Sequence, residues 1–278
     1  MGDTSLMERL CVHTITTKGL SLMECVEEYP RHGVKGITVW RNALLGRPLG
    51  ESGRMIRDSG MDVVSLCRGG FFPAVDVQGR QKALDDNRLA IEEAHAIGAP
   101  SVVLVCGAVP GQPLEVSRSQ ITDGIAAVLP LAVSAGVRLL IEPLHPMYAD
   151  DRSAISTLRQ ANAVCDALGS PEGLGIALDV YHVWWDPDLG EQIALTARKG
   201  RLDAFHVCDW RTPTVDLLND RGLMGEGCIP LRRISERVDS VGFRGFREVE
   251  IFSHRLWALD PRELLKRIVE AYRETIAG

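Results

Sequence analysis

The sequence contains no run of about 18 apolar residues, the length that a helix needs to cross a membrane. Its N-terminal segment, MGDTSLMERLCVHTITTKG, lacks the long apolar stretch of a secretory leader. Seven cysteines are present, but none forms a CxxC pair, and an odd number does not suit a disulfide framework. We therefore expect a cytoplasmic protein with reduced thiols and no membrane partner.

An excess of positive charge is also lacking. The chain has 31 Lys and Arg against 37 Asp and Glu, and its net charge is −6. Nucleic-acid-binding domains usually carry a basic patch, so no nucleic-acid partner is expected. No linker or low-complexity segment divides the chain. Its 278 residues are close to the roughly 250 of an eight-fold β/α barrel, and we predict one domain over residues 1–278.

A half-repeat recurs along the chain, in which a helical stretch ends at a glycine or small residue and a short apolar run follows. AIGAPSVVLVC and SAGVRLLIE are examples. Glycine supplies a left-handed helix cap, and continuous apolar runs are typical of parallel strands buried on both faces. Eight strands are predicted near residues 10–14, 36–40, 61–67, 101–106, 137–142, 174–179, 202–207 and 246–251. This alternation predicts an α/β fold, a closed (β/α)8 TIM barrel; an open doubly wound sheet is the alternative.

Acidic and imidazole side chains lie at the ends of the last four predicted strands. They are Glu142, Asp179, His206 and Glu250, in VRLLIE, LGIALD, LDAFHV and FREVEI. The strand ends of such a barrel converge at one rim, where three carboxylates repel one another unless a cation lies between them. We predict that the four residues bind one divalent metal ion. Mn²⁺ is our first choice, with Mg²⁺, Co²⁺ or Zn²⁺ as alternatives, because the oxygen ligands are joined by an imidazole.

The first four strand ends carry residues that we expect to face the substrate. They are His13, Trp40, Arg68 and Cys106. The loops after the third and seventh strands, residues 68–81 and 208–230, are long enough to form walls or lids.

Several of these segments resemble the xylose-isomerase-like TIM barrels. IEPL, LDVYH, HVCDW and EVEIFS, together with SLCRGGFF, carry the resemblance, which spans nearly the whole chain. This superfamily includes sugar isomerases, ketose 3-epimerases, hydroxypyruvate isomerase, inosose-processing enzymes and endonuclease IV. The resemblance implies the same four metal ligands. It also places His182 near the metal and substrate, and Arg211 within reach of the substrate.

The implied chemistry is proton transfer next to a carbonyl group. A metal that binds adjacent carbonyl and hydroxyl oxygens acidifies the C–H between them and stabilises the enediolate. Glu142 and Glu250 are the candidate acid–base catalysts, because each can remove or return that proton. We expect an isomerase or epimerase that acts on a small sugar, keto-polyol or related hydroxycarbonyl compound.

Six residues are expected to bind the substrate: His182, Arg211, His13, Trp40, Arg68 and Tyr148. The epimerases carry a second glutamate six residues after the strand-five ligand, where this chain has Tyr148. A phenol does not replace a carboxylate as a charged acceptor, so we expect the substrate to differ from a free ketohexose. We expect a ring or an unusual substituent that Trp40, Phe71 and Trp184 accommodate.

Three other functions are left open by the sequence. A lyase would begin with the same proton abstraction, as in dehydration of an inosose or 3-dehydroshikimate, or cleavage of a C-glycoside. An endonuclease IV-like repair enzyme would need more His and acidic ligands, for three metals, and a basic groove. A non-catalytic binding protein would keep the ligands without turnover. The sequence also leaves open whether the substrate is phosphorylated and whether the protein forms a homo-oligomer.

Overall fold

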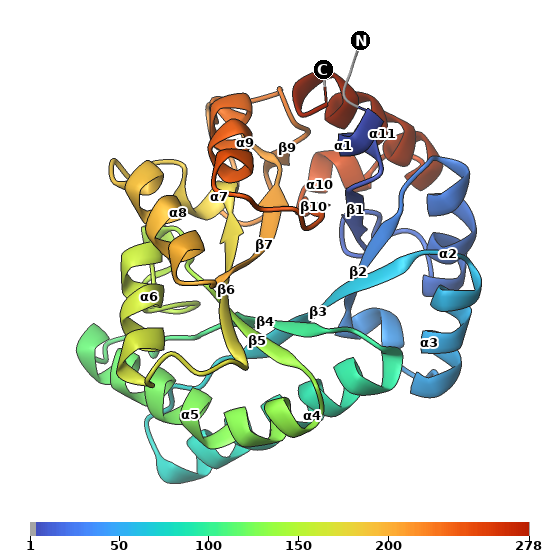
Figure 1. Cartoon of the computed structure of the whole chain (residues 1–278). Coiled ribbons are helices and arrows are strands. Elements are labelled where there is room, and N and C mark those ends of the chain that lie inside the picture. Colours follow the sequence, from blue (N-terminus) through green and yellow to red (C-terminus); the bar gives the residue numbers. More distant parts are fainter. Residues whose placement is uncertain (1–3, 278) are drawn as a thin grey trace.

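The computed structural model describes residues 4–277 and forms a closed barrel of eight parallel strands, in the order β1-β10-β7-β6-β5-β4-β3-β2 (Figure 1). The barrel strands are β1 (Leu10–His13), β2 (Gly36–Trp40), β3 (Asp62–Gly70), β4 (Ser101–Val105), β5 (Arg138–Glu142), β6 (Leu174–Asp179), β7 (Leu202–Val207) and β10 (Arg247–Val249). Every predicted strand overlaps one of these, and the predicted (β/α)8 fold is confirmed. Residues 1–3 and 278 of the predicted domain lie outside the described residues.

Helices surround the barrel on its outer side (Figure 1). The longer ones are α2 (Leu22–Arg31), α3 (Leu49–Asp58), α4 (Val77–Ile97), α5 (Leu114–Ser134), α6 (Leu158–Ala167), α8 (Leu189–Arg198), α9 (Leu231–Ser240) and α11 (Pro261–Thr275). Short helices are α1 (Thr4–Met7), α7 (Val180–Val183), α10 (His254–Trp257), η1 (Arg41–Leu44) and η2 (Pro146–Tyr148). None of the helices within residues 4–277 combines the length and apolar character required to cross a membrane.

Local sequence signals fix where the helices begin and end. Ser21 caps α2 through a capping box in which Glu24 bonds back to the Ser21 backbone. Helix α4 ends at Gly98, whose φ of 80° lies in the left-handed region that glycine adopts without strain. The chain can therefore turn at once from α4 into β4, as the half-repeat predicted.

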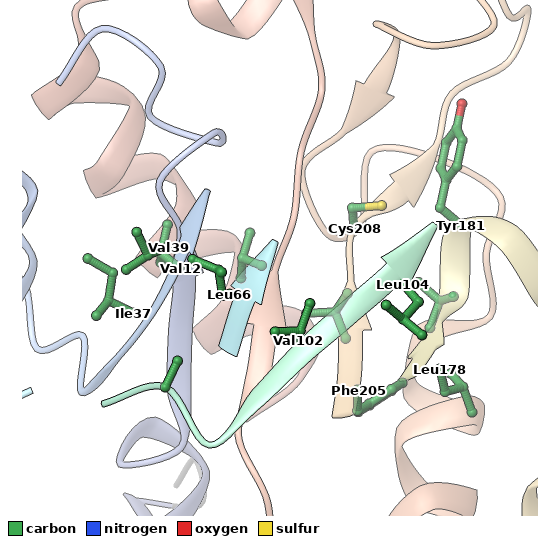
Figure 2. Packing of buried hydrophobic residues seen from close by; sticks show 14 of the residues in the cluster. Val12, Ile37, Val39, Leu66, Val102, Leu104, Leu178, Tyr181, Phe205 and Cys208 are labelled. Carbon is green, nitrogen blue, oxygen red and sulfur yellow. The ribbon is translucent and has the colours of Figure 1, made fainter. Parts of the chain in front are cut away.

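The strands alternate between an outer apolar face and the barrel interior. Outward side chains such as Val102 and Leu104 join the main hydrophobic core under the helices, with neighbours from β1, β2, β3, β6 and β7 (Figure 2). A smaller cluster of Cys67, Val103, Leu140, Ala177 and Ala204 lies apart from it. These positions alternate with the outward ones, so they fill the inside of the barrel. The next inward position, two residues closer to the carboxyl end of each strand, lies at the rim of the barrel.

Two loops at the carboxyl ends of the strands differ in size. The loop after β3 covers only residues 71–76, because β3 continues to Gly70 and α4 begins at Val77. The loop after β7 extends to residue 230 and contains a two-stranded antiparallel hairpin of β8 (Asp209–Trp210) and β9 (Arg221–Gly222). This hairpin lies over the barrel mouth, so residues in the middle of a long loop come close to the ends of the barrel strands.

Candidate metal and substrate site

Four predicted ligands meet inside the barrel mouth. Glu142 ends β5, Asp179 ends β6, His206 lies in β7 and Glu250 follows β10. All four side chains are buried, and they offer one ligand atom each within 4.8 Å of one another. Strand alternation explains the convergence, because each residue occupies an inward position at or just beyond the carboxyl end of its strand.

Several atoms in this group lack a hydrogen-bond partner. Within the described part of the chain, Oε1 of Glu142 and both ring nitrogens of His206 are buried without one. Oε1 of Glu142 lies 3.1 Å from Nδ1 of His206. A divalent ion bonded to both at about 2.1 Å would separate neighbouring ligand atoms by about 3 Å. The donor set of three carboxylates and an imidazole therefore fits a divalent metal ion.

A buried arginine that the sequence analysis did not single out lies against two of these carboxylates. Nη1 of Arg221 donates to Oδ2 of Asp179 and to Oε2 of Glu250, both at 2.9 Å. Its Nη2 lies 3.0 Å from Nε2 of His182. Arg221 is only 3% exposed, so its charge acts in a medium that screens it weakly. It neutralises part of the negative charge at the site.

The β8–β9 hairpin positions Arg221. The Asp209 carboxylate accepts backbone N–H groups of Trp210, Gly225 and Ile229, at 2.8–3.0 Å, and so fixes the loop. The Arg221 N–H donates to the carbonyl of Phe252, just after Glu250. Both ends of the hairpin are therefore tied to the rim, and the guanidinium is held over the carboxylates.

Arg211, the arginine that the sequence analysis placed on the substrate, lies elsewhere in this loop. Its guanidinium forms an ion pair with Asp220. The cavity above the carboxylates is lined by Arg221 and not by Arg211. The two arginines lie ten positions apart in one loop, and only the hairpin register decides which of them faces inward.

A second layer of polar groups lies beneath the four ligands. Oε2 of Glu248 accepts a hydrogen bond from Thr38 at 2.6 Å and one from Ser65 at 3.2 Å. It also lies 3.3 Å from Nε2 of His13, whose Nδ1 is 3.1 Å from Oε1 of Glu250. Nε2 of His206 is 3.7 Å away from the same Glu248 oxygen. Glu248 therefore places a buried negative charge next to the imidazoles of His13 and His206.

These contacts shift the protonation of the site. Burial opposes a charge on His206, but the Glu248 and Glu142 carboxylates outweigh it and raise the pKa of His206 to about 10. Burial raises the pKa of Asp179 to about 7, although Arg221 acts in the opposite direction. Burial would also raise the pKa of Glu250, but His13 and Arg221 hold it well below its usual range.

A cavity of about 240 Å³ opens above the carboxylates. Four of the six predicted substrate contacts line it: Trp40, Arg68, Tyr148 and His182. His13 lies just below, where its Nδ1 is 3.2 Å from the donating Trp40 Nε1. Trp184 instead borders an outer groove between α8 and α9, and Cys106 joins the outer core.

Two of the lining residues are already engaged by the protein. The Tyr148 hydroxyl donates to the carbonyl of Leu217, and burial raises the pKa of Tyr148 to about 12. Burial and the Arg221 charge lower the pKa of His182 well below its usual value. Tyr148 is therefore a neutral phenol and His182 a neutral imidazole at the cavity wall.

Comparison with known proteins places the chain in a family. The model of the xylose isomerase-like TIM barrel family matches residues 26–275. Protein SMc04130 from Sinorhizobium meliloti 1021 has a solved structure with 46% identity and a TM-score of 0.94, covering 98% of this chain and 100% of that one. An inosose isomerase of Halalkalibacterium halodurans is 24% identical over 220 residues, 74% of this chain and 72% of that protein. The IOLI protein with a bound zinc atom, 20% identical, has a TM-score of 0.83 over 96% of this chain and 98% of its own.

Removal of the Arg221 charge should destabilise the protein. In Arg221→Gln, Asp179 and Glu250 lose their shared cation, and the loss of one partner from a buried ion pair costs about 3–5 kcal/mol. Arg159→Gln is the control, since Arg159 and its partner Asp188 are both exposed; we expect a loss of about 1 kcal/mol or less. Urea unfolding in the presence of a chelator measures both. Equal stability of the two variants would contradict the role given to Arg221.

Proposed function

Because the chain belongs to the xylose isomerase-like TIM barrel family, we propose that it is a divalent-metal-dependent isomerase or epimerase. Its substrate would be a small sugar, keto-polyol or related hydroxycarbonyl compound. The observation that carries the proposal is the convergence of Glu142, Asp179, His206 and Glu250 at the base of a cavity. Similarity to an inosose isomerase supports the reaction class.

Glu142, Asp179, His206 and Glu250 would hold the metal ion. When bound, a divalent ion supplies Lewis acidity for a carbonyl and an adjacent hydroxyl oxygen. Mn²⁺ is our first choice for a mixed oxygen and nitrogen donor set, with Mg²⁺, Co²⁺ and Zn²⁺ as alternatives. The zinc atom in the related IOLI structure supports an ion of this type.

Glu142 and Glu250 would move the proton. One carboxylate removes the proton from the carbon next to the carbonyl, which gives an enediolate. The other, in its protonated form, delivers a proton to the same or the neighbouring carbon. Their environments differ. Among the described residues, Oε1 of Glu142 has no hydrogen-bond partner, whereas Glu250 has one oxygen near His13 and the other on Arg221. The two groups are therefore not equivalent, which suits a reaction with a defined direction of proton transfer.

The remaining lining groups would shape and orient the substrate. Arg221, rather than Arg211, is the arginine that can donate to a substrate oxygen near Glu250. Neutral His182 and Tyr148 line the cavity, and so does Trp40, whose Nε1 donates to His13. The Phe252 ring packs on Trp40 at 5.2 Å between centroids. An aromatic side of this kind can stack on the apolar face of a ring or of a carbon chain.

A lyase reaction is the second candidate, and it needs an acid for the departing oxygen. Tyr148 is poorly suited, because its hydroxyl already donates to Leu217 and its pKa is raised. The endonuclease-like alternative would need ligands for three metals. In the described residues, two candidate metal groups occur, and they share His206 and Glu250. Both observations support the isomerase or epimerase over these alternatives.

Mn²⁺ should bind more tightly as the pH rises. His206 must lose its proton to bind the ion, and its pKa is about 10, so the affinity should increase about tenfold per pH unit between about pH 7 and 9. Below about pH 7 the slope should steepen, because Asp179 also takes up a proton. Calorimetric titration of chelator-treated protein measures this affinity, and an affinity independent of pH would count against this ligand set.

Removal of the metal by a chelator should abolish turnover, while circular dichroism should show that the barrel stays intact.

Neutral substitutions of either glutamate should slow turnover. We expect Glu142→Gln and Glu250→Gln each to lower kcat by at least about 10²-fold, the lower range for loss of general acid–base catalysis. Exposed Glu115→Gln is the control. Metal content is measured in each variant, since both residues are also proposed ligands. If a fully metallated Glu250→Gln protein exchanges the substrate proton with solvent at the normal rate, Glu250 is not the base.

The reaction itself is tested by proton NMR in deuterated water. Enzyme and Mn²⁺ are incubated with a panel of ketohexoses and inososes, and we expect deuterium exchange next to the carbonyl of an inosose or similar compound. Loss of water from the same compound would identify a dehydratase. Rapid epimerisation of plain fructose would contradict the expectation drawn from Tyr148, and absence of exchange in every compound that binds would contradict the proposed reaction.

A further inference from the structure

Two arginines that line the cavity have no acidic partner in the part of the chain that the structure describes. Arg68 follows Cys67 in β3, and Arg152 follows η2. Both are half-buried. Among the described residues, neither guanidinium has a carboxylate oxygen within 4.0 Å; their side chains contact aromatic rings instead. The chain has more acidic than basic residues, so this lack of pairing does not come from a shortage of carboxylates.

Aromatic rings hold these two charges in place. The Arg68 guanidinium carbon lies 4.1 Å from the centre of the Phe71 ring, and that of Arg152 lies 5.8 Å from the centre of the Tyr148 ring. A cation–π contact restrains a guanidinium but leaves its charge and its N–H donors available. The pair is therefore oriented without being neutralised.

The backbone that carries Arg68 is also fixed. The Asn87 side chain accepts from the Gly70 N–H at 2.6 Å and donates to the Gly70 carbonyl at 2.7 Å. Gly70 has a φ of 105°, and a Cβ there would lie 1.9 Å from the carbonyl oxygen of Val105. Only glycine allows β3 to pass so close to β4, and the end of β3 is thereby held at the cavity rim.

A neighbouring cation, Arg41, is paired, in contrast to these two. Arg41 lies beside the Arg68 carbonyl and binds both Asp86 and Glu93. The Asp86 charge reaches Arg68 but is engaged by Arg41. Burial and the neighbouring charge of Arg152 lower the pKa of Arg68. Two like charges at one cavity wall repel each other, and an anion between them would remove that repulsion.

We propose that Arg68 and Arg152 form an oxyanion subsite, and that the substrate carries a carboxylate or phosphate group at the end remote from the reacting carbons. This inference rests on the proposed function, because it takes the reacting carbons to lie at Glu142 and Glu250. The subsite lies in the same cavity as the candidate metal ligands. One end of the substrate would meet the metal-binding carboxylates and the other the two guanidiniums. Guanidinium groups suit both oxyanions because their N–H donors match the spacing of two oxygens.

Three compounds that differ only at carbon 6 test the subsite: D-fructose, D-fructuronate and D-fructose 6-phosphate. Calorimetric titration of the Mn²⁺-loaded protein should show that at least one of the two acids binds at least about tenfold more tightly than fructose. Arg68→Gln and Arg152→Gln should each weaken the binding of that acid by about tenfold, as expected for loss of a hydrogen bond to a charged group. Fructose binding should change less than about twofold. The acid that binds more tightly shows whether the subsite prefers a carboxylate or a phosphate group.

Arg47→Gln is the matched control. Arg47 is also half-buried and has no carboxylate partner among the described residues, but it does not line the cavity. Inorganic phosphate serves as a probe that is independent of the carbon chain. It should bind more weakly to the Arg68→Gln/Arg152→Gln double variant than to Arg47→Gln. Equal phosphate binding to both, with neither acid favoured over fructose, overturns the subsite.

The outcomes separate the subsite from the reaction. If the arginine variants lose acid binding and none of the bound compounds exchanges deuterium, the subsite stands and the proposed reaction fails. If a neutral compound exchanges deuterium at the same rate in wild type and in the double variant, while no acid gains affinity, the reaction stands and the subsite fails.

Discussion

The site depends on one electrostatic constraint, which is that four carboxylates are buried within two adjacent levels of the barrel. Glu142, Asp179 and Glu250 occupy the rim, and Glu248 lies beneath them. Water cannot screen these charges, so the protein must supply positive charge itself. Arg221 compensates two of the rim carboxylates, and the His13 and His206 imidazoles lie between the levels. The same negative field that makes burial costly is what draws a divalent cation into the mouth of the barrel.

Much of this arrangement could be predicted from periodicity. Continuous apolar runs after glycine-capped helices located the eight strands, and the position of Glu142, Asp179, His206 and Glu250 at strand ends predicted their convergence. Glu248 could have been found in the same way. It stands two positions before Glu250 in REVEI, and side chains two apart in a strand share a face. For a charged residue within an apolar strand, the face on which its side chain lies is thus a better guide to its role than its distance from the strand end.

Arg221 could not be identified in this way, because its position depends on a loop. Strand periodicity carries no information about residues 208–230, where Arg211 and Arg221 are equally plausible by composition. The choice is made by tertiary contacts: Asp209 fixes the loop backbone, and Asp220 bridges to Ser253 beyond β10. Trp184 illustrates the same limit. It follows α7 closely in sequence, but it faces an outer groove between α8 and α9 instead of the cavity.

The distribution of charge around the cavity also limits what can bind in it. Negative charge is concentrated on the side of β5, β6 and β10, whereas unpaired positive charge lies at Arg68 and Arg152. A neutral polyol would satisfy hydrogen bonds at both ends but would leave the charges of the two guanidiniums uncompensated. A molecule with an oxyanion at one end and a hydroxycarbonyl group at the other would match both ends at once. It would bind in only one direction, because the reversed orientation places an anion against Glu142 and two cations against the carbonyl end. Fixing the direction of binding in this way fixes which carbon lies within reach of the two glutamates, so recognition at one end of the cavity would determine the position of proton transfer at the other.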